Sequence, residues 1–502
     1  MKGVVAAGHQ LTADAGAQVL REGGNAVDSA VAAVMASFAA ESPLTSLGAG
    51  GFMLVHVAGG GDHLLDFFVE AGGRGLDPGS RGELAPVEIV FDETPQVFFV
   101  GPASCGIPGT AAGLWEASRR FGTMPFEALA DPAVRFAREG VRVTPEQAYV
   151  FTLLERILCR QPEMADLYAP GGNLLTAGDI FRFPALGDAL EAIAHEGPGW
   201  LYDSDLTLRL CDWVCERGGL MSPADFAAYE VIERAPVEAR YRNRRVLTNA
   251  PPSSGGVLIA YALGLLERAG DPPPLDDPDT LALVADAMAG ASRARGGDFH
   301  QRLHEEGFAA SFLGGDSRLG STTHISVLDA VGNAVSVTCS NGSGSGVLPP
   351  GTGVHLNNML GEEDLNPQGF HMHEPGVRVT SMMAPTIVVR DGEIELALGS
   401  AGSNRIRSAI LQVIRYVVDY DMDAAAAVRM GRMHYEGGIL HVEPGFPDGA
   451  LAELERRGYR VVRWKGLNLY FGGAQAARRD PAGGALSGGG DPRRGGIAVV
   501  VD

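Results

Sequence analysis

The sequence lacks a surplus of basic residues and lacks any apolar run long enough to cross a membrane. Its 502 residues carry a formal net charge of -21, whereas nucleic acids select a basic surface, so we exclude nucleic acid as a partner. The longest nearly apolar run, residues 30–40, is interrupted by Ser37 and too short to span a bilayer. Residues 1–7 are too short for the apolar core of a secretory signal. We therefore expect no membrane contact and a cytoplasmic protein, or a periplasmic or secreted one if a leader precedes this sequence.

Cysteine is scarce, and its spacing predicts no redox or zinc motif. The chain has five cysteines, an odd number, and no CxxC pair. Cys211 and Cys215 share a predicted helix face, which leaves a metal or a disulfide open, but we favour buried free thiols. Cys339 has no evident partner base, and its side chain alternates with that of Ser340, so it is not favoured as a nucleophile.

Motifs for nucleotide binding, serine hydrolysis and metal binding are also missing. The glycine-rich residues 47–52 follow a helix and precede a strand, the reverse of a dinucleotide fingerprint, and lack the GxGxxG spacing. Residues 251–256, PPSSGG, lack GxSxG, so we expect the serines to cap a helix over residues 257–268 or to line a pocket. Three histidines lack neighbouring carboxylates or cysteines, so we expect loop-surface positions and neither metal nor cofactor: His355, His371 and His373.

The composition is that of a soluble globular protein, with 45% hydrophobic and 20% charged residues. A chain of 502 residues can hold two or three domains. Near the N-terminus the pattern predicts a helix over residues 11–22 with Thr12 as its N-cap. A second helix is predicted over residues 26–40, capped by Asn25.

One segment near the middle of the chain organises the rest. Residues 320–346 begin with the pair Thr322 and Thr323, and then alternate apolar and polar residues as a strand does. A turn at residues 329–333 is followed by an antiparallel strand over residues 334–340 and a Gly/Ser-rich loop. By itself this pattern is typical of an ordinary hairpin with a flexible tail. The run before it, residues 289–320, loses periodicity and is predicted to be exposed and mobile.

A series of short motifs along nearly the whole chain resembles the γ-glutamyltranspeptidase family of N-terminal-nucleophile hydrolases. The motifs follow the family's order: GGNAVDSAVAA (23–33), LGAGGF (47–52), GIPGTAAGL (106–114), PPSSGG (251–256), TTHISVLDAVGNAVSVT (322–338), LNNML (356–360), SMMAPTIV (381–388), GSAGSNRI (399–406), YFGGAQA and DPRRGG. The resemblance implies an α+β fold, specifically a four-layer αββα sandwich in which two antiparallel sheets lie between helical layers.

The resemblance also implies self-cleavage between Ser321 and Thr322, giving fragments 1–321 and 322–502 that remain one intertwined unit. The freed α-amino group of Thr322 has an intrinsic pKa of about 7.7–8.0, so it can accept the proton of the hydroxyl on the same residue. Thr322 would then be both nucleophile and base, and would attack an amide carbonyl to form an acyl-enzyme.

Several further roles are carried over from matching positions. Backbone N–H groups of Gly402 and Ser403 would hold the oxyanion, Ser340 would orient the nucleophile, and Asn341 would bind substrate after a short deletion in its loop. Glu362 matches the acidic group that meets the substrate's α-amino group.

Three positions depart from the family pattern and bear on the substrate. Phe68 stands where the family has the arginine that clamps the α-carboxylate. The family's serine pair is Ser381-Met382, and Met359 replaces a Gln or Glu. Two arginines are candidates for the missing charge, Arg74 and Arg378.

The leading hypothesis is therefore a self-processing γ-glutamyltransferase or glutathione hydrolase-like enzyme acting on a small amide, with water or an amine as acceptor. Two alternatives remain open. One is an acylase that cleaves other side-chain amides, such as glutaryl or fatty-acyl amides, and the other is a non-catalytic binding homologue. A homodimer is also left open.

Overall fold

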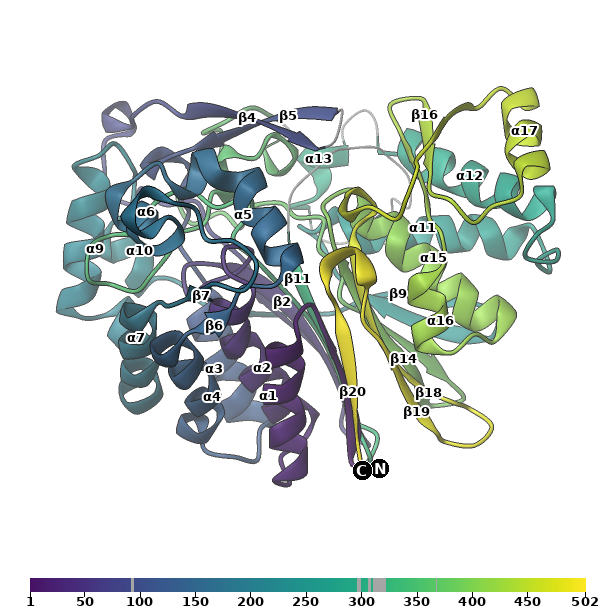
Figure 1. The fold of residues 1–502 in the computed structure, drawn as a ribbon, viewed down its shortest axis with the longest axis horizontal. Coiled ribbons are helices and arrows are strands. Elements are labelled where there is room, and N and C mark those ends of the chain that lie inside the picture. The colour runs from purple at the N-terminus through teal and green to yellow at the C-terminus, as the bar shows by residue number, and fades with distance from the viewer. Residues whose placement is uncertain (92–93, 296–298, 306–307, 310–321, 367) are drawn as a thin grey trace.

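The computed structural model describes residues 1–91, 94–295, 299–305, 308–309, 322–366 and 368–502. Two antiparallel sheets form its centre (Figure 1). The first sheet has seven strands in the order β20 (Ile497–Val501), β1 (Gly3–Ala7), β11 (Thr323–Asp329), β12 (Ala334–Ser340), β2 (Gly50–Val57), β3 (Gly61–Phe67) and β8 (Ile232–Arg234). The second has six, in the order β19 (Leu486–Gly489), β18 (Gly473–Arg479), β14 (Glu393–Ala401), β13 (Thr386–Arg390), β10 (Arg244–Thr248) and β9 (Val237–Tyr241).

The predicted central hairpin is confirmed and lies in the middle of the first sheet. β11 pairs with β1 on one side and with β12 on the other, and β12 pairs in turn with β2. Ile325 and Val327 point into the apolar core beneath the helices, whereas Leu328 joins a second core shared with the other sheet. Because successive side chains of a strand point to opposite faces, β11 contributes to two separate cores.

The two sheets pack face to face, and strands β11 and β12 contact strands β14 and β18. Small polar side chains join them across the interface. Ser336 Oγ donates to the carbonyl of Leu398 at 2.8 Å, and Ser326 Oγ donates to the carbonyl of Gln475 at 3.1 Å. These hydrogen bonds fix β11 and β12 relative to the second sheet.

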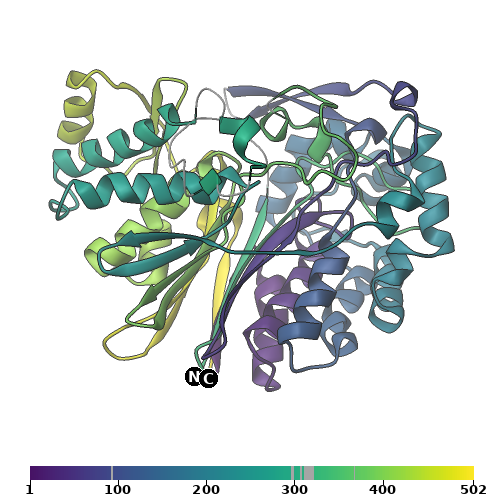
Figure 2. The same ribbon diagram turned by 180° about the vertical axis from the view of Figure 1, so that it is seen from behind.

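Helices lie on the outer sides of both sheets (Figure 2). The first sheet is covered by α1 (Gln10–Arg21), α2 (Ala26–Ala40) and α3 (Thr110–Phe121), and α4 (Phe126–Glu139) packs on α2. The second is covered by α11 (Ser254–Arg268), α15 (Arg405–Tyr420) and α16 (Ala424–Arg429), and α12 (Pro278–Arg293) packs on α11. Every residue of α2 is buried, because its alanines allow close packing. The predicted α+β class is confirmed.

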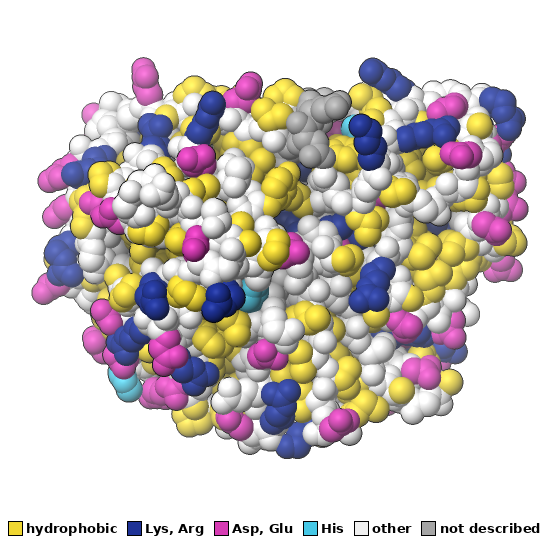
Figure 3. All heavy atoms as spheres, viewed as in Figure 1, with side chains coloured by type: hydrophobic (Ala, Val, Ile, Leu, Met, Phe, Trp, Pro, Cys, Tyr) yellow, Lys and Arg dark blue, Asp and Glu magenta, His cyan; other side chains and the backbone are white. Residues whose placement is uncertain are grey.

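The remaining elements surround this centre. On the side of the first sheet they are β4 (Ala85–Phe91), β5 (Thr94–Val100), β6 (Val141–Arg142), α5 (Pro145–Leu158), α6 (Pro162–Tyr168), β7 (Ile180–Phe181), α7 (Pro184–Glu196), α8 (Gly199–Tyr202), α9 (Asp205–Cys215) and α10 (Pro223–Ala227). Elsewhere they are α13 (Phe299–Arg302), β15 (Met433–Glu436), β16 (Ile439–Val442), α17 (Asp448–Arg456) and β17 (Arg460–Arg463). No helix among the described residues has the length and apolarity that a bilayer crossing requires. On the face drawn in Figure 3, acidic and basic side chains are interspersed.

Two local predictions are wrong, and a third, the helix cap at Ser253, holds in position but not in its hydrogen bond. α1 begins at Gln10 with His9 as its N-cap, so Thr12 lies inside the helix, where its hydroxyl donates to Glu41 at 2.8 Å. Ser253 occupies the N-cap position of α11 without making a capping bond, because its hydroxyl donates instead to the carbonyl of Met383 at 2.7 Å. The run 289–320 is not simply exposed: its first residues complete α12, and several of its apolar side chains are buried. Residues 310–320 lie outside the described part of the chain.

Candidate active site

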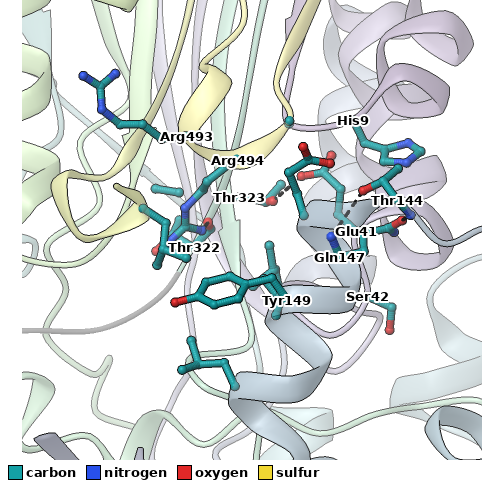
Figure 4. Close-up of a pocket in the computed structure, with 18 of the residues that line it drawn as sticks. His9, Glu41, Ser42, Thr144, Gln147, Tyr149, Thr322, Thr323, Arg493 and Arg494 are labelled. Carbon is teal, nitrogen blue, oxygen red and sulfur yellow. Dashed lines mark hydrogen bonds between the residues drawn. The ribbon is translucent and has the colours of Figure 1, made fainter. Parts of the chain in front are cut away.

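Thr322 directly precedes β11, an interior strand of the first sheet, and only 3% of its surface is exposed. Its carbonyl oxygen accepts a hydrogen bond from Arg494 Nη1 at 3.0 Å. Figure 4 shows the two residues side by side at the end of the sheet. Ser321 lies outside the described residues, so the expected cleavage site is described from its Thr322 side only.

Thr322 borders a small cavity of about 20 Å³, a volume that suits about one water molecule. This cavity gathers six of the eight predicted site residues, and its other walls are apolar. The full lining is Phe68, Thr322, Ser340, Met359, Glu362, Leu365, Ser381, Met382, Met383, Ser403 and Ile406. These residues come from distant parts of the chain, so the fold brings together what the sequence separates. Asn341 and Gly402 are neighbours of lining residues but do not line the cavity themselves.

Gly402 and Ser403 form a tight turn at the end of β14, with φ angles of 111° and 63°. A Cβ atom on Gly402 would lie 2.5 Å from the Cα of Gly472, so only glycine fits there. Among the described residues, no acceptor receives a hydrogen bond from the backbone N–H of either residue. Adjacent amides in such a turn can bind an anionic oxygen.

Ser340 and Asn341 end β12 beside Thr322. Ser340 Oγ accepts the backbone N–H of Gly342 at 2.8 Å. Asn341 is fully buried, its Oδ1 accepts from Ser46 Oγ at 2.9 Å, and its Nδ2 lies 3.2 Å from His355 Nδ1. The structure thus places Asn341 in a protein network behind the small cavity, and a contact with substrate would require one of these bonds to open.

His355 is buried, so the prediction of a loop-surface position is wrong for it. Burial lowers the pKa of its imidazole to about 4, which keeps it neutral at neutral pH. No group of three potential metal ligands of the His, Cys, Asp or Glu type occurs within the described ranges. All five cysteines are free, and Cys105, Cys211 and Cys339 are buried.

Glu362 brings a carboxyl group into the small cavity with one oxygen unused. Its Oε1 accepts the backbone N–H of Ser343 at 2.6 Å, whereas Oε2 has no hydrogen-bond partner among the described residues. Burial raises the pKa of this carboxyl to about 7. A cationic group of a ligand would stabilise the ionised form.

Phe68 presents an aromatic ring to the small cavity where a charged clamp was expected from the family pattern. The ring stacks on Phe52 with a centroid separation of 5.2 Å and is fully buried. Met359 and Met382 add two flexible apolar walls. This part of the cavity therefore favours apolar contacts over a carboxylate.

Neither arginine considered as a substitute clamp lines the small cavity. Arg378 donates to the backbone carbonyl of Phe68 and lies 3.4 Å from the carboxylate of Glu70. Arg74 lies 3.7 Å from Glu70 and 3.6 Å from Asp225. Because neither guanidinium group borders the small cavity, the geometry gives no support to either arginine as the missing charge.

His324, next to the threonine pair, is not a general base. Its ring nitrogens lie 2.8 Å from Thr338 Oγ1 and 2.9 Å from Ser326 Oγ. Burial lowers the pKa of the imidazole to about 3, so the ring is neutral and serves to join strands. The hydroxyl of Thr322 therefore has no histidine partner on its own strand.

Sequence reasoning missed the groups on the other side of Thr322. Glu41, at the C-terminal end of α2, accepts the hydroxyl of Thr323 at 2.6 Å, and burial raises the pKa of its carboxyl. Arg494 is half-buried, and the desolvation of its guanidinium lowers its pKa to about 10. Both border a large cavity of about 300 Å³ that Thr322 also lines (Figure 4). The DPRRGG motif contains Arg494, but its spacing does not reveal a contact made across 172 residues.

Comparisons with known proteins agree with this geometry. The sequence model of the γ-glutamyltranspeptidase family matches residues 12–501. The acylase ACY 1 proenzyme of Pseudomonas sp. (strain V22) is 33% identical, over 92% of this chain and 88% of that protein. The glutathione hydrolase proenzyme of Escherichia coli (strain K12) is 30% identical, over 98% of this chain and 90% of that protein. The crystal structure of cephalosporin acylase from Bacillus halodurans is similar with a TM-score of 0.84 and 26% identity, covering 99% of this chain and 95% of that one.

An α+β fold in which a threonine directly precedes an interior strand of a sheet thus defines a class of amide-processing enzymes that includes both hydrolases and acylases. The chain belongs to the γ-glutamyltranspeptidase family.

Proposed function

We propose that the protein is a self-processing enzyme that hydrolyses or transfers the acyl group of γ-glutamyl amides through Thr322. The observation that carries this proposal is the convergence of Thr322 with Ser340, Glu362, Ser381 and Ser403 on one cavity. Relatives named glutathione hydrolase proenzyme support both the activity and the processing.

Processing would break the bond between Ser321 and Thr322 and free the α-amino group of Thr322. That amine accepts the hydroxyl proton while Oγ attacks the amide carbonyl. The N–H groups of Gly402 and Ser403 stabilise the oxyanion, and the protonated amine returns the proton to the leaving nitrogen. Water or a second amine then attacks the ester, which regenerates Thr322.

Two fragments, 1–321 and 322–502, would remain associated after cleavage. Each sheet contains strands from both sides of the cleavage site: β1 pairs with β11 and β20, β2 pairs with β12, and β10 pairs with β13. With helices outside both sheets, this arrangement supports the four-layer αββα sandwich. Separation would expose both cores to water, so we expect a stable heterodimer of fragments.

A second candidate is an acylase for less polar acyl groups. It is favoured by Phe68, Met359 and Met382 in the cavity wall, and by the engagement of Arg74 and Arg378 elsewhere. The relatives named acylase ACY 1 proenzyme and cephalosporin acylase support it. In this candidate Thr322 keeps its role and only the acyl pocket differs.

A panel of p-nitroanilides tests both candidates with one processed protein. Preference for γ-glutamyl over glutaryl and fatty-acyl anilides supports the first, and the reverse order supports the second. Mass spectrometry of the acid-quenched reaction should place the acyl group on the peptide that begins with Thr322. Complete processing without turnover of any anilide would favour a non-catalytic binding homologue instead.

A further inference from the structure

The large cavity of about 300 Å³ and the small cavity both border Thr322. Within the described part of the chain, Thr322 is the one residue that lines both, and Ala401 and Ser403 border them from either side of the Gly402 turn. An amide whose carbonyl reaches Thr322 would therefore have one substituent in each cavity. The proposed function assigns the residues around the small cavity to the acyl side and gives the larger cavity no role.

One wall of the large cavity is the apolar face of α5. Tyr149, Val150, Leu153 and Leu154 recur at helical spacing and line it. Tyr149 is 42% exposed, which places it where the cavity meets the solvent. A wall of this kind binds flat or branched apolar groups rather than charged ones.

Two buried hydrogen-bond donors border the same space without a partner among the described residues: His9 Nε2 and Arg494 Nε. His9 Nδ1 accepts the N–H of Leu11 at 3.1 Å, so the proton of the neutral imidazole lies on Nε2. The carboxyl of Glu41 already accepts hydroxyls from Thr12 and Thr323. The buried polar side-chain atoms of this lining that lack a partner are therefore donors, and unpaired buried donors favour a ligand that carries an acceptor oxygen.

We infer that the large cavity binds the amine side of the substrate, and that this amine is aromatic or otherwise bulky and apolar and carries a carbonyl or carboxylate oxygen. This inference rests on the proposed function, which makes Thr322 the acylated residue. The assignment of sides follows from the lining, because the residues matched to acyl binding border the small cavity. The large cavity is left for the leaving amine in hydrolysis and for the acceptor amine in transfer.

In transfer, the amine nitrogen attacks the carbonyl of the Thr322 ester. The C–N bond forms, the C–Oγ bond breaks, and the proton lost by the nitrogen passes through the α-amino group to Oγ. No further reactant is required. An acceptor held in the large cavity would compete with water for the ester, so its occupancy sets the ratio of transfer to hydrolysis.

Binding of aminomethylcoumarin, a fluorescent aromatic amine with a ring carbonyl, tests the inference without any turnover. Three proteins are compared, and all carry Thr322→Ala. The first has no other change, the second adds Leu153→Trp to fill the cavity, and the third adds Leu208→Trp on the exposed face of α9 as the matched control. Fluorescence anisotropy should show saturable binding that Leu153→Trp weakens by about tenfold or more and Leu208→Trp leaves unchanged. Equal affinity in all three proteins, or no binding to Thr322→Ala, would overturn the inference.

Kinetics of the proteins that retain Thr322 separate this inference from the proposed function. With a fixed acyl donor, Leu153→Trp should lower the transfer-to-hydrolysis ratio for aminomethylcoumarin by about tenfold relative to the Leu208→Trp control. An unchanged ratio would overturn the amine assignment. A third outcome distinguishes the two proposals. If Leu153→Trp abolishes the binding of aminomethylcoumarin but no amide is turned over, the proposed function is contradicted and the cavity is still supported as an amine-binding site.

Discussion

Arg494 Nη1 donates a hydrogen bond to the carbonyl oxygen of Thr322 at 3.0 Å. The guanidinium is buried, and Asp491 and Glu41 are the acidic groups whose charges stabilise it. On the next residue, the hydroxyl of Thr323 is held by Glu41. The backbone of Thr322 is thus held by the guanidinium of Arg494, a residue near the C-terminal end of the sequence.

Replacing Arg494 by Met should lower kcat by about 10- to 100-fold with a small change in KM. A hydrogen bond from a charged donor contributes about 1.5–3 kcal/mol, and losing it frees the nucleophile to leave its attack geometry. Steady-state kinetics on the preferred anilide measure the effect. Arg457→Met, at the end of α17 and 40% exposed, is the control. An unchanged kcat in Arg494→Met would show that this bond does not position Thr322.

Replacing Phe68 by Arg should move the acyl preference toward γ-glutamyl compounds. A guanidinium at this position can pair with the substrate's α-carboxylate, and such a bond is worth about 10- to 100-fold in relative kcat/KM. The measured quantity is the kcat/KM ratio of γ-glutamyl to fatty-acyl anilide, because the fatty-acyl group carries no carboxylate for the arginine to pair with.

Phe68→Leu serves as the control, since it removes the stacking on Phe52 without adding charge. Thermal unfolding and completeness of processing show whether the buried arginine is tolerated. A ratio that stays constant in a folded, processed Phe68→Arg protein would argue against Phe68 as the residue that sets acyl specificity.

Replacing Gly402 by Ala should abolish most activity. The added Cβ meets Gly472 at 2.5 Å in a backbone conformation with φ of 111°, so the turn that carries the two amides must shift. Gly438→Ala is the matched control, because its φ is 83° and its Cβ would meet nothing within 4 Å. We expect at least about 100-fold loss of kcat for Gly402→Ala, the size of losing one oxyanion donor, and near-normal kcat for the control. Similar activity in the two variants would rule out the turn as the oxyanion site.

Glu362 should make the folded protein less stable as the pH rises. Its pKa is raised from 4.5 to about 7 by burial, so the folded state holds a proton that the unfolded state has released. The stability contribution is fully present below pH 4.5 and is lost as the pH rises to about 7, with a total change of about 3 kcal/mol.

Denaturant unfolding of Thr322→Ala with and without Glu362→Gln measures this difference in a chain that stays in one piece. Relative to the Glu362→Gln protein, the parent should lose stability between pH 4.5 and 7 and then level off. Parallel stability curves across this range would show that the carboxyl is not buried as described.

The sequence predicts the central hairpin because alternation and a Gly-Asn turn are local signals, and β11 and β12 form where expected. It also predicts the residues of the small cavity, since the family motifs carry them. It does not predict Arg494 beside Thr322, or Glu41 beside Thr323, because those contacts depend on how distant strands and helices pack. The prediction of Thr12 as a helix cap is wrong for the same reason, because its hydroxyl donates a hydrogen bond to Glu41, which is 29 residues away in the sequence.

Whether an arginine replaces the lost clamp could not be decided from the sequence either. Arg378 is close to Phe68 in space, yet it contacts the backbone of Phe68 and not the cavity. Only the side-chain geometry distinguishes a guanidinium that supports a wall from one that meets the substrate.

The central claim is that Thr322 becomes an N-terminal residue that is its own base. Intact mass of the purified wild-type protein tests it most directly. We predict two fragments whose boundary lies between Ser321 and Thr322, and a single unbroken chain of 52.6 kDa for Thr322→Ala. A wild-type protein that stays one chain of that mass on prolonged incubation, yet turns over its amide substrate, would contradict the account.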